Sequence, residues 1–393
     1  ISTIIILGFV TRSYGEFGTG VFTLVLTYLA FFYLAADFGF NAHVLPKIMA
    51  VNGYTQWQKL LGLRLVWSIC LMVLALVILP LLPFSNRVFD QSVLYGTLAI
   101  VGSSLFITSN ALFQSRLRYD LSILASSLGA TVTLGLIFLL VYTKAPMPYL
   151  IIAHMLGWVV CGISAIFLVR KLIGKLENKV FQLSIDFSYI RQTIKQTLPI
   201  SITLILNVVY FRLDAFILAT VKGFTDVGVY NLAYQIFQSV LVLPAFIMNS
   251  YYPIILKQVN SNIDRFRSNL VKACLIMLGL AILATLAILV LSPLIIQFLT
   301  AGKGFSGSVD SLKILSLGLP AYFVSSVLMW VMVTIKKYKQ MVAIYLIGLL
   351  ANLGLNLLLI PRYSYIASAY ITGISEYLIL FLQIAILFKA WKK

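Results

Sequence analysis

The sequence has very little charge for its length. Only 10% of its 393 residues are charged, whereas 61% are hydrophobic, and the mean hydropathy is +1.02. A water-soluble globule of this size needs more polar side chains than this to cover its surface. The composition therefore excludes a soluble globular protein and predicts a chain that lies largely in lipid.

Acidic residues are the scarcest charged class. The chain has 11 Asp and Glu against 29 Lys and Arg, which gives a formal net charge of +18. A basic surplus can indicate nucleic-acid binding, but here the basic residues lie in short breaks between apolar runs and not along one face. We expect no nucleic-acid partner.

Cysteine is also rare, and catalytic motifs are missing. Cys70, Cys161 and Cys274 lie far apart inside apolar segments, so they predict neither a disulfide framework nor a zinc site. The sequence has no P-loop, no nucleophile elbow and no pair of catalytic carboxylates. We expect a protein without metal or other cofactor that is not an enzyme.

What the chain does contain is a series of apolar runs, each long enough to cross a bilayer as a helix of about 20 residues. Runs such as 276–291 are apolar on every side, which favours helices over the alternating strands of a membrane barrel. The fold class predicted is an all-α integral membrane protein with about twelve spans. They lie near residues 1–10, 19–46, 60–80, 91–113, 121–142, 148–169, 198–220, 228–255, 273–298, 311–335, 341–360 and 365–388. The first is short, and we expect the sequence to begin inside that helix.

Lysine and arginine predict the orientation, because short cytoplasmic loops carry an excess of both. Most of the 29 basic residues fall in one set of alternate loops, near residues 47–64, 116–118, 170–195, 257–272, 336–339 and 389–393. This pattern places both ends of the chain in the cytoplasm, and only Arg212 is expected inside a span.

The longest polar stretch divides the spans into six plus six. The segment from Gly20 to Pro46 has a counterpart from Gly228 to Pro253, and an offset of six helices makes the two copies parallel. We predict an N-terminal lobe at 1–169, a cytoplasmic linker at 170–197 and a C-terminal lobe at 198–393, with a central cavity between the lobes.

Charged residues inside spans are candidate functional groups, because each costs at least about 2.5 to 3.5 kcal/mol to insert at the bilayer centre. The guanidinium of Arg212 offers a fork of donors that matches phosphate oxygens, and an interhelical ion pair is the alternative. Asp37, Asp214 and Glu376 are candidates for binding a coupling proton or sodium ion, or for structural hydrogen bonds. His43 and His154 are interpreted as helix-contact residues.

Uncharged polar side chains form stripes along several spans. A hydroxyl and amide lining suits a sugar, whereas polar contacts between membrane helices give the same pattern. The candidate substrate-binding residues, besides Arg212, are Asn207, Asn231, Gln235, Gln238, Asn352 and Asn356.

Several stretches together resemble one family. They are Arg12 to Phe40 (RSYGEFGTGVFTLVLTYLAFFYLAADFGF), Leu198 to Leu218, Gly228 to Pro253, and Asn352 to Glu376 (NLGLNLLLIPRYSYIASAYITGISE). Their order and spacing are similar to those of the bacterial polysaccharide and O-antigen repeat-unit flippases (the Wzx group) of the multidrug/oligosaccharidyl-lipid/polysaccharide exporter (MOP) superfamily.

The resemblance implies a function and partners. It implies alternating-access transport of undecaprenyl-diphosphate-linked oligosaccharide, of O-antigen or capsule type, across the bacterial inner membrane. Membrane lipid, H⁺ or Na⁺, and polysaccharide polymerase and chain-length proteins are the partners expected. A drug/cation antiporter of the same superfamily is one alternative, and a membrane glycan polymerase or glycosyltransferase is another; the latter should carry a large periplasmic loop.

Overall fold

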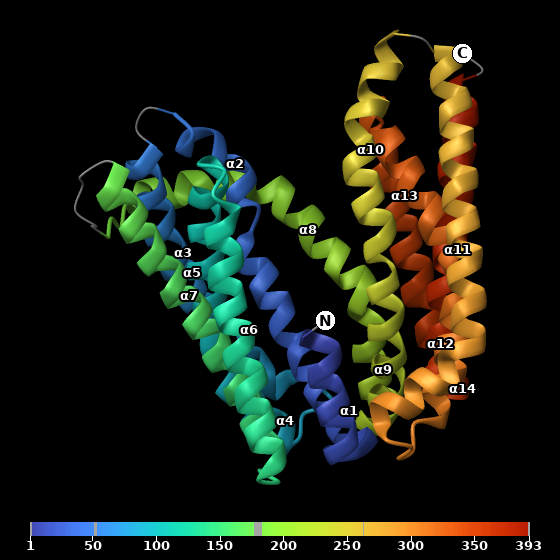
Figure 1. Cartoon of the computed structure of the whole chain (residues 1–393), viewed down its shortest axis with the longest axis horizontal. Coiled ribbons are helices and arrows are strands. Elements are labelled where there is room, and N and C mark those ends of the chain that lie inside the picture. The colour runs from blue at the N-terminus through green and yellow to red at the C-terminus, as the bar shows by residue number, and fades with distance from the viewer. Residues whose placement is uncertain (1, 51–52, 177–182, 262, 392–393) are drawn as a thin grey trace. The chain divides into compact units, whose positions relative to one another are not determined.

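The computed structural model describes residues 2–50, 53–176, 183–261 and 263–391 (Figure 1). These residues form helices joined by short turns, and no β-strand occurs among them. The all-α prediction is confirmed. Apolar side chains cover most helices on more than one side, which is what lipid as a solvent demands of a spanning segment.

The helices follow the predicted runs closely. The first part of the chain contains α1 (Ser2–Asp37), α2 (Phe40–Ile48), α3 (Gly53–Ile78), the 3₁₀ turn η1 (Leu79–Leu81), α4 (Arg87–Gly96), α5 (Leu98–Ser115), α6 (Tyr119–Tyr142) and α7 (Pro148–Leu176). The second part contains α8 (Phe187–Val221), α9 (Phe224–Val240), α10 (Val242–Ser261), α11 (Ile263–Thr300), α12 (Ser306–Ser316), α13 (Leu319–Thr334) and α14 (Tyr338–Trp391).

The described part of the chain has 8 helices that are long and apolar enough to cross a membrane, or 9 if the bent pair α12 and α13 counts as one span. Two helices hold two predicted spans each, because α1 is broken at Gly15 and α14 at Ser364, where φ is positive. The chain is therefore a multi-pass membrane protein.

Two compact units make up the chain. One comprises Ile1–Tyr14 and Val21–Arg212, and the other comprises Gly15–Gly20 and Leu213–Lys393. The lobe and linker boundaries expected from the sequence remain a prediction.

Glycines bring α5, α6 and α7 of the first unit close together. A Cβ added at Gly102 would lie 2.6 Å from the carbonyl oxygen of Trp158, and one at Gly157 would lie 1.8 Å from Thr133 Oγ1. Membrane helices associate through such small residues because bare backbone allows close contact. Gly157 also lines a pocket beside these helices.

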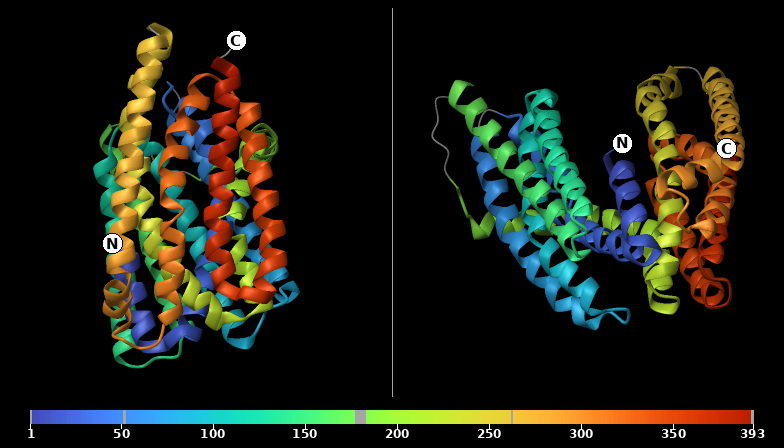
Figure 2. Two further views of the ribbon diagram at one scale, coloured as in Figure 1. Left: turned by 90° about the vertical axis from the view of Figure 1, so that its right-hand side faces the viewer. Right: turned by 60° about the horizontal axis from the view of Figure 1, so that its bottom comes forward.

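The second unit ends in a helical hairpin. The backbone of Ser364 leaves the helical conformation with φ 51° and ψ −138°, and the two halves of α14 run back alongside one another (Figure 2). Asn352 Nδ2 donates to Ser375 Oγ at 3.2 Å, and these residues lie at nearly equal distances from the break. The hairpin therefore places polar residues of the two halves, such as Asn352 and Ser375, side by side.

The segment Gly15–Gly20 packs on α9 and α12 within the second unit. A Cβ at Gly20 would lie 1.7 Å from the Phe224 carbonyl oxygen, and one at Gly228 would lie 2.0 Å from the Glu16 carbonyl oxygen. The Glu16 side chain also accepts a hydrogen bond from the Phe305 backbone N–H at 2.9 Å. The two glycines that mark the internal repeat thus lie against each other.

Candidate functional site

The first unit contains a buried ion pair. Arg64 on α3 is 1% exposed, and its Nη2 lies 2.6 Å from Oδ1 of Asp37, the last residue of α1. A second guanidinium nitrogen lies 3.5 Å from Thr108 Oγ1 on α5. Asp37, a candidate for ion coupling, is thus neutralised by an arginine in this structure.

The sequence did not reveal Arg64 as the partner of Asp37. The helix α3 begins at Gly53, so Arg64 lies 11 positions, or about 16 Å, along it. Sequence reasoning started this span near residue 60 and left Arg64 close to the loop. The missed signal was Asp37 itself, since an acid inside a span requires a partner.

Asp214 on α8 is buried in the second unit. It accepts a hydrogen bond from the hydroxyl of Tyr230 on α9 and another, at 2.7 Å, from the Ala215 backbone N–H. The Tyr230 hydroxyl also lies 3.1 Å from Thr372 Oγ1 on α14. A chain of contacts thus connects α8 through α9 to the last helix.

Glu376 lies one turn beyond Thr372 on α14 and is also buried. Its carboxyl accepts a hydrogen bond from the Ser325 hydroxyl on α13. The neighbouring residue Ser375 contacts Asn352, whose Oδ1 accepts from Asn356 Nδ2 at 2.9 Å. Contacts with the stretch Ser368–Glu376 therefore link Asp214, Glu376 and Asn352, and Asn356 joins them through Asn352, so that four of the predicted site residues are connected.

Some buried oxygens in this cluster accept no hydrogen bond from the described residues. They are Asn356 Oδ1 and Ser368 Oγ. Buried polar atoms in proteins are normally satisfied, so orphaned oxygens mark a place for a ligand or water. Carboxylate, amide and hydroxyl oxygens form a donor set that suits a hard cation.

The other predicted residues are placed less tightly. Asn231 is buried on α9, and Gln235 and Gln238 are half-buried on the same helix. Arg212 is half-buried on α8. The side chain of Asn207 lies outside the described residues.

Comparison with known proteins identifies the family. The profile of the polysaccharide biosynthesis protein family matches residues 2–259, and the MatE profile matches residues 199–358. No curated protein matches the chain.

Solved structures share the fold at low sequence identity. The lipid II flippase MurJ in an inward closed conformation has a TM-score of 0.78 and 16% identity, over 98% of this chain and 85% of that chain. An inward-facing multidrug resistance MATE family transporter of the MOP superfamily has a TM-score of 0.77 and 13% identity, over 100% and 96%.

A MOP superfamily transporter from Pyrococcus furiosus has a TM-score of 0.64 and 14% identity, over 100% of this chain and 95% of that chain. These neighbours are transporters and flippases, and their fold agrees with the helices described here. The chain therefore belongs to the polysaccharide biosynthesis protein family, and with it to the MOP superfamily of transporters.

Proposed function

We propose that the protein is a flippase that moves undecaprenyl-diphosphate-linked oligosaccharide repeat units, of O-antigen or capsule type, from the cytoplasmic to the periplasmic leaflet of the bacterial inner membrane. The observation that carries the proposal is the match of the polysaccharide biosynthesis profile to residues 2–259. Both ends of the chain lie in the cytoplasm in this proposal, as the basic loops indicate.

The substrate carries a diphosphate, and a cation is needed to hold it in a space of low dielectric. Arg212 supplies this charge in the proposal, because guanidinium donates a fixed fork of hydrogen bonds to phosphate oxygens. The amide side chains of Asn231, Gln235 and Gln238 lie on the next helix and contact the sugar. Alternating access then exposes the head group while the polyprenyl chain stays in lipid.

Transport against a gradient needs coupling. The cluster around Asp214 and Glu376 supplies it in the proposal by binding a monovalent cation through carboxylate, amide and hydroxyl oxygens. Asp37 is a weaker candidate, because Arg64 already neutralises it. The polymerase and chain-length proteins that act on exported repeat units are partners in this scheme.

Deletion of the gene tests the substrate. If the protein is a flippase, lipid-linked repeat units should accumulate on the cytoplasmic leaflet of the deletion strain, and surface glycan should be lost. Arg212→Ala should fail to restore export, Arg212→Lys should restore it in part because it keeps charge without the fork, and removal of the exposed Lys222 should have no effect. Normal surface glycan in the deletion strain would reject the proposal, and drug efflux that survives Arg212→Ala would favour the antiporter.

A further inference from the structure

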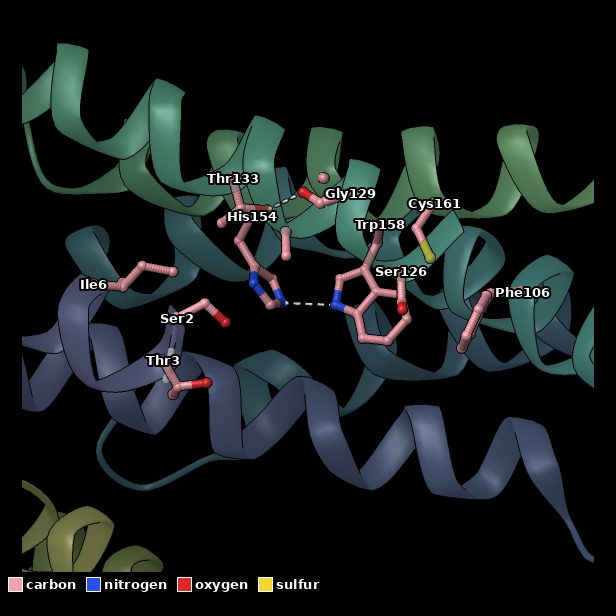
Figure 3. Close-up of a pocket in the computed structure, with 12 residues that line it drawn as sticks. Ser2, Thr3, Ile6, Phe106, Ser126, Gly129, Thr133, His154, Trp158 and Cys161 are labelled. Atoms are coloured by element: carbon pink, nitrogen blue, oxygen red, sulfur yellow. Dashed lines mark hydrogen bonds between the residues drawn. The ribbon is translucent and has the colours of Figure 1, made fainter. Parts of the chain in front are cut away.

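A pocket of about 210 Å³ lies inside the first unit, between the start of α1 and helices α5, α6 and α7 (Figure 3). Its polar lining comes from both sides: Ser126, Thr133, His154 and Trp158 on α6 and α7, and Ser2 and Thr3 on α1. The residues predicted to bind substrate or ion lie elsewhere. The pocket is therefore a separate feature of the fold.

Glycines keep this pocket open. Gly129 and Gly157 line it at the contact of α6 with α7, where a Cβ at Gly129 would lie 2.6 Å from the Gly157 carbonyl oxygen. Larger side chains would force the helices apart or occupy the space. Close packing of the two helices also fixes the positions of Thr133 and His154.

Hydrogen bonds determine the protonation of His154. Trp158 Nε1–H lies 3.2 Å from His154 Nε2, and the indole nitrogen is a donor only, so Nε2 must accept. The Tyr33 hydroxyl lies 3.2 Å from the same Nε2. An accepting Nε2 carries no proton, which makes the imidazole neutral with its hydrogen on Nδ1.

The remaining imidazole donor, Nδ1–H of His154, is available to a bound ligand. Among the described residues none accepts a hydrogen bond from Nδ1–H, and in Figure 3 this nitrogen lies on the edge of the ring turned away from Trp158. Ser126 and Thr133 donate their hydroxyl hydrogens to the backbone carbonyls of Ile123 at 3.0 Å and Gly129 at 3.1 Å. Their oxygens therefore face the pocket as acceptors.

The chemistry of the lining selects the ligand. None of the described lining residues is charged, so neither a phosphate nor a cationic drug finds a counter-charge. One imidazole donor, two hydroxyl acceptors and the Trp158 ring match a ring that carries hydroxyl groups, each of which donates and accepts. The volume equals that of roughly seven waters at about 30 Å³ each, which is room for one sugar ring.

We propose that this pocket is a subsite for a single neutral sugar ring of the transported glycan. Naming the glycan as its source rests on the proposed function. The binding chemistry itself rests on His154, Trp158 and Thr133.

Titration of purified protein with neutral methyl pyranosides, of the gluco, galacto, manno and rhamno series, tests the subsite through Trp158 fluorescence. We expect saturable quenching by at least one of them, absent in Trp158→Phe. His154→Leu should weaken binding at least tenfold, whereas the other histidine provides a matched control, His43→Leu, that should bind as wild type does. If His154→Leu fails to fold, the nearly isosteric Thr133→Val replaces it as the test and should also weaken binding.

Three results would overturn the subsite. The first is that no pyranoside gives a saturable signal. The second is that His154→Leu and Thr133→Val both bind the sugar as tightly as the wild type does. The third is that tetraphenylphosphonium or inorganic pyrophosphate displaces the sugar.

Complementation separates this inference from the proposed function. A deletion strain without a glycan defect rejects the flippase, whatever the pocket binds. If the deletion does lose surface glycan, His154→Leu should restore several-fold less of it than wild type or His43→Leu. Full restoration by a folded His154→Leu would reject the subsite and leave the flippase standing.

Discussion

Asp37 and Arg64 illustrate how unequal burial within one ion pair shapes its energetics. Arg64 is 1% exposed and Asp37 is 28% exposed. Removal of one partner from a buried pair costs about 3 to 5 kcal/mol, because the other charge stays buried without compensation. It therefore costs more free energy to leave the more buried charge, Arg64, without its partner than to leave Asp37 without its partner.

Asp37→Ala should therefore destabilise the protein more than Arg64→Met, and the double variant should recover part of the loss. Thermal unfolding of the purified protein measures all three. A double variant no more stable than Asp37→Ala would show that the two side chains do not act as a pair.

The oxygen cluster in the second unit makes a prediction about ions. Sodium, compared with potassium at the same ionic strength, should raise the unfolding temperature of the wild type, since a ligand at 100 times its dissociation constant stabilises by about 2.7 kcal/mol. Asp214→Asn and Asn356→Leu should abolish this shift. Asp226→Asn is the control, because that carboxyl contacts Ser364 outside the cluster and should leave the shift intact. Lack of any sodium effect on the wild type would reject a sodium site here.

At the scale of elements, one carboxylate, that of Asp186, fastens the start of α8 to α3. Asp186 accepts the Tyr189 backbone N–H at 3.0 Å, as an N-cap does, and forms an ion pair with Lys59 on α3 at 2.9 Å. The hydrogen bond from Tyr189 and then that from Lys59 lower the pKa of Asp186 below its usual 3.8. A lowered pKa means that the contact is complete above pH 3.8 and is lost as the pH falls below it.

Cleavage by trypsin at Arg191 and Lys195 reports on this fastening. At neutral pH we expect Asp186→Ala to be cut fastest, because it loses the cap and the ion pair. Asp186→Asn, which keeps a capping oxygen, and Lys59→Gln should be cut at intermediate rates. Pepsin cleavage of the wild type should rise only below about pH 3.8. A rise near pH 6 would assign the fastening to another group.

At the scale of the whole molecule, the sequence predicts an orientation that the helices alone do not fix. Asn86 and Arg118 lie on either side of the span that α4 and α5 form, Arg87–Ser115. Each is replaced by a single cysteine in a variant without Cys70, Cys161 and Cys274. A membrane-impermeant maleimide added to intact cells with a permeabilised outer membrane should label position 86 and spare position 118. The reverse pattern would place both termini in the periplasm.

Much of this architecture was predictable, because apolar length and basic loops depend on local sequence. The stripe of Ser368, Thr372 and Glu376 was also predictable, since residues four apart share a helix face. Asp37 signals that a partner is needed, but the identity of that partner, Arg64, was not predictable, because pairing between helices depends on packing. The pocket at His154 depends on contacts of Gly157 and Gly129 across two helices, and no pattern along one helix reveals such contacts.

The hairpin at Ser364 has a consequence for biosynthesis. Thr372, Ser375 and Glu376 lie in the second half of α14 and contact Tyr230, Asn352 and Ser325. A ribosome delivers this span after α9, α13 and the first half of α14. Until that span inserts, α9, α13 and the first half of α14 stand in lipid with polar groups that lack these partners. A nascent chain that stalls near Pro361 thus displays an incomplete polar surface within the bilayer, which quality-control proteases can recognise.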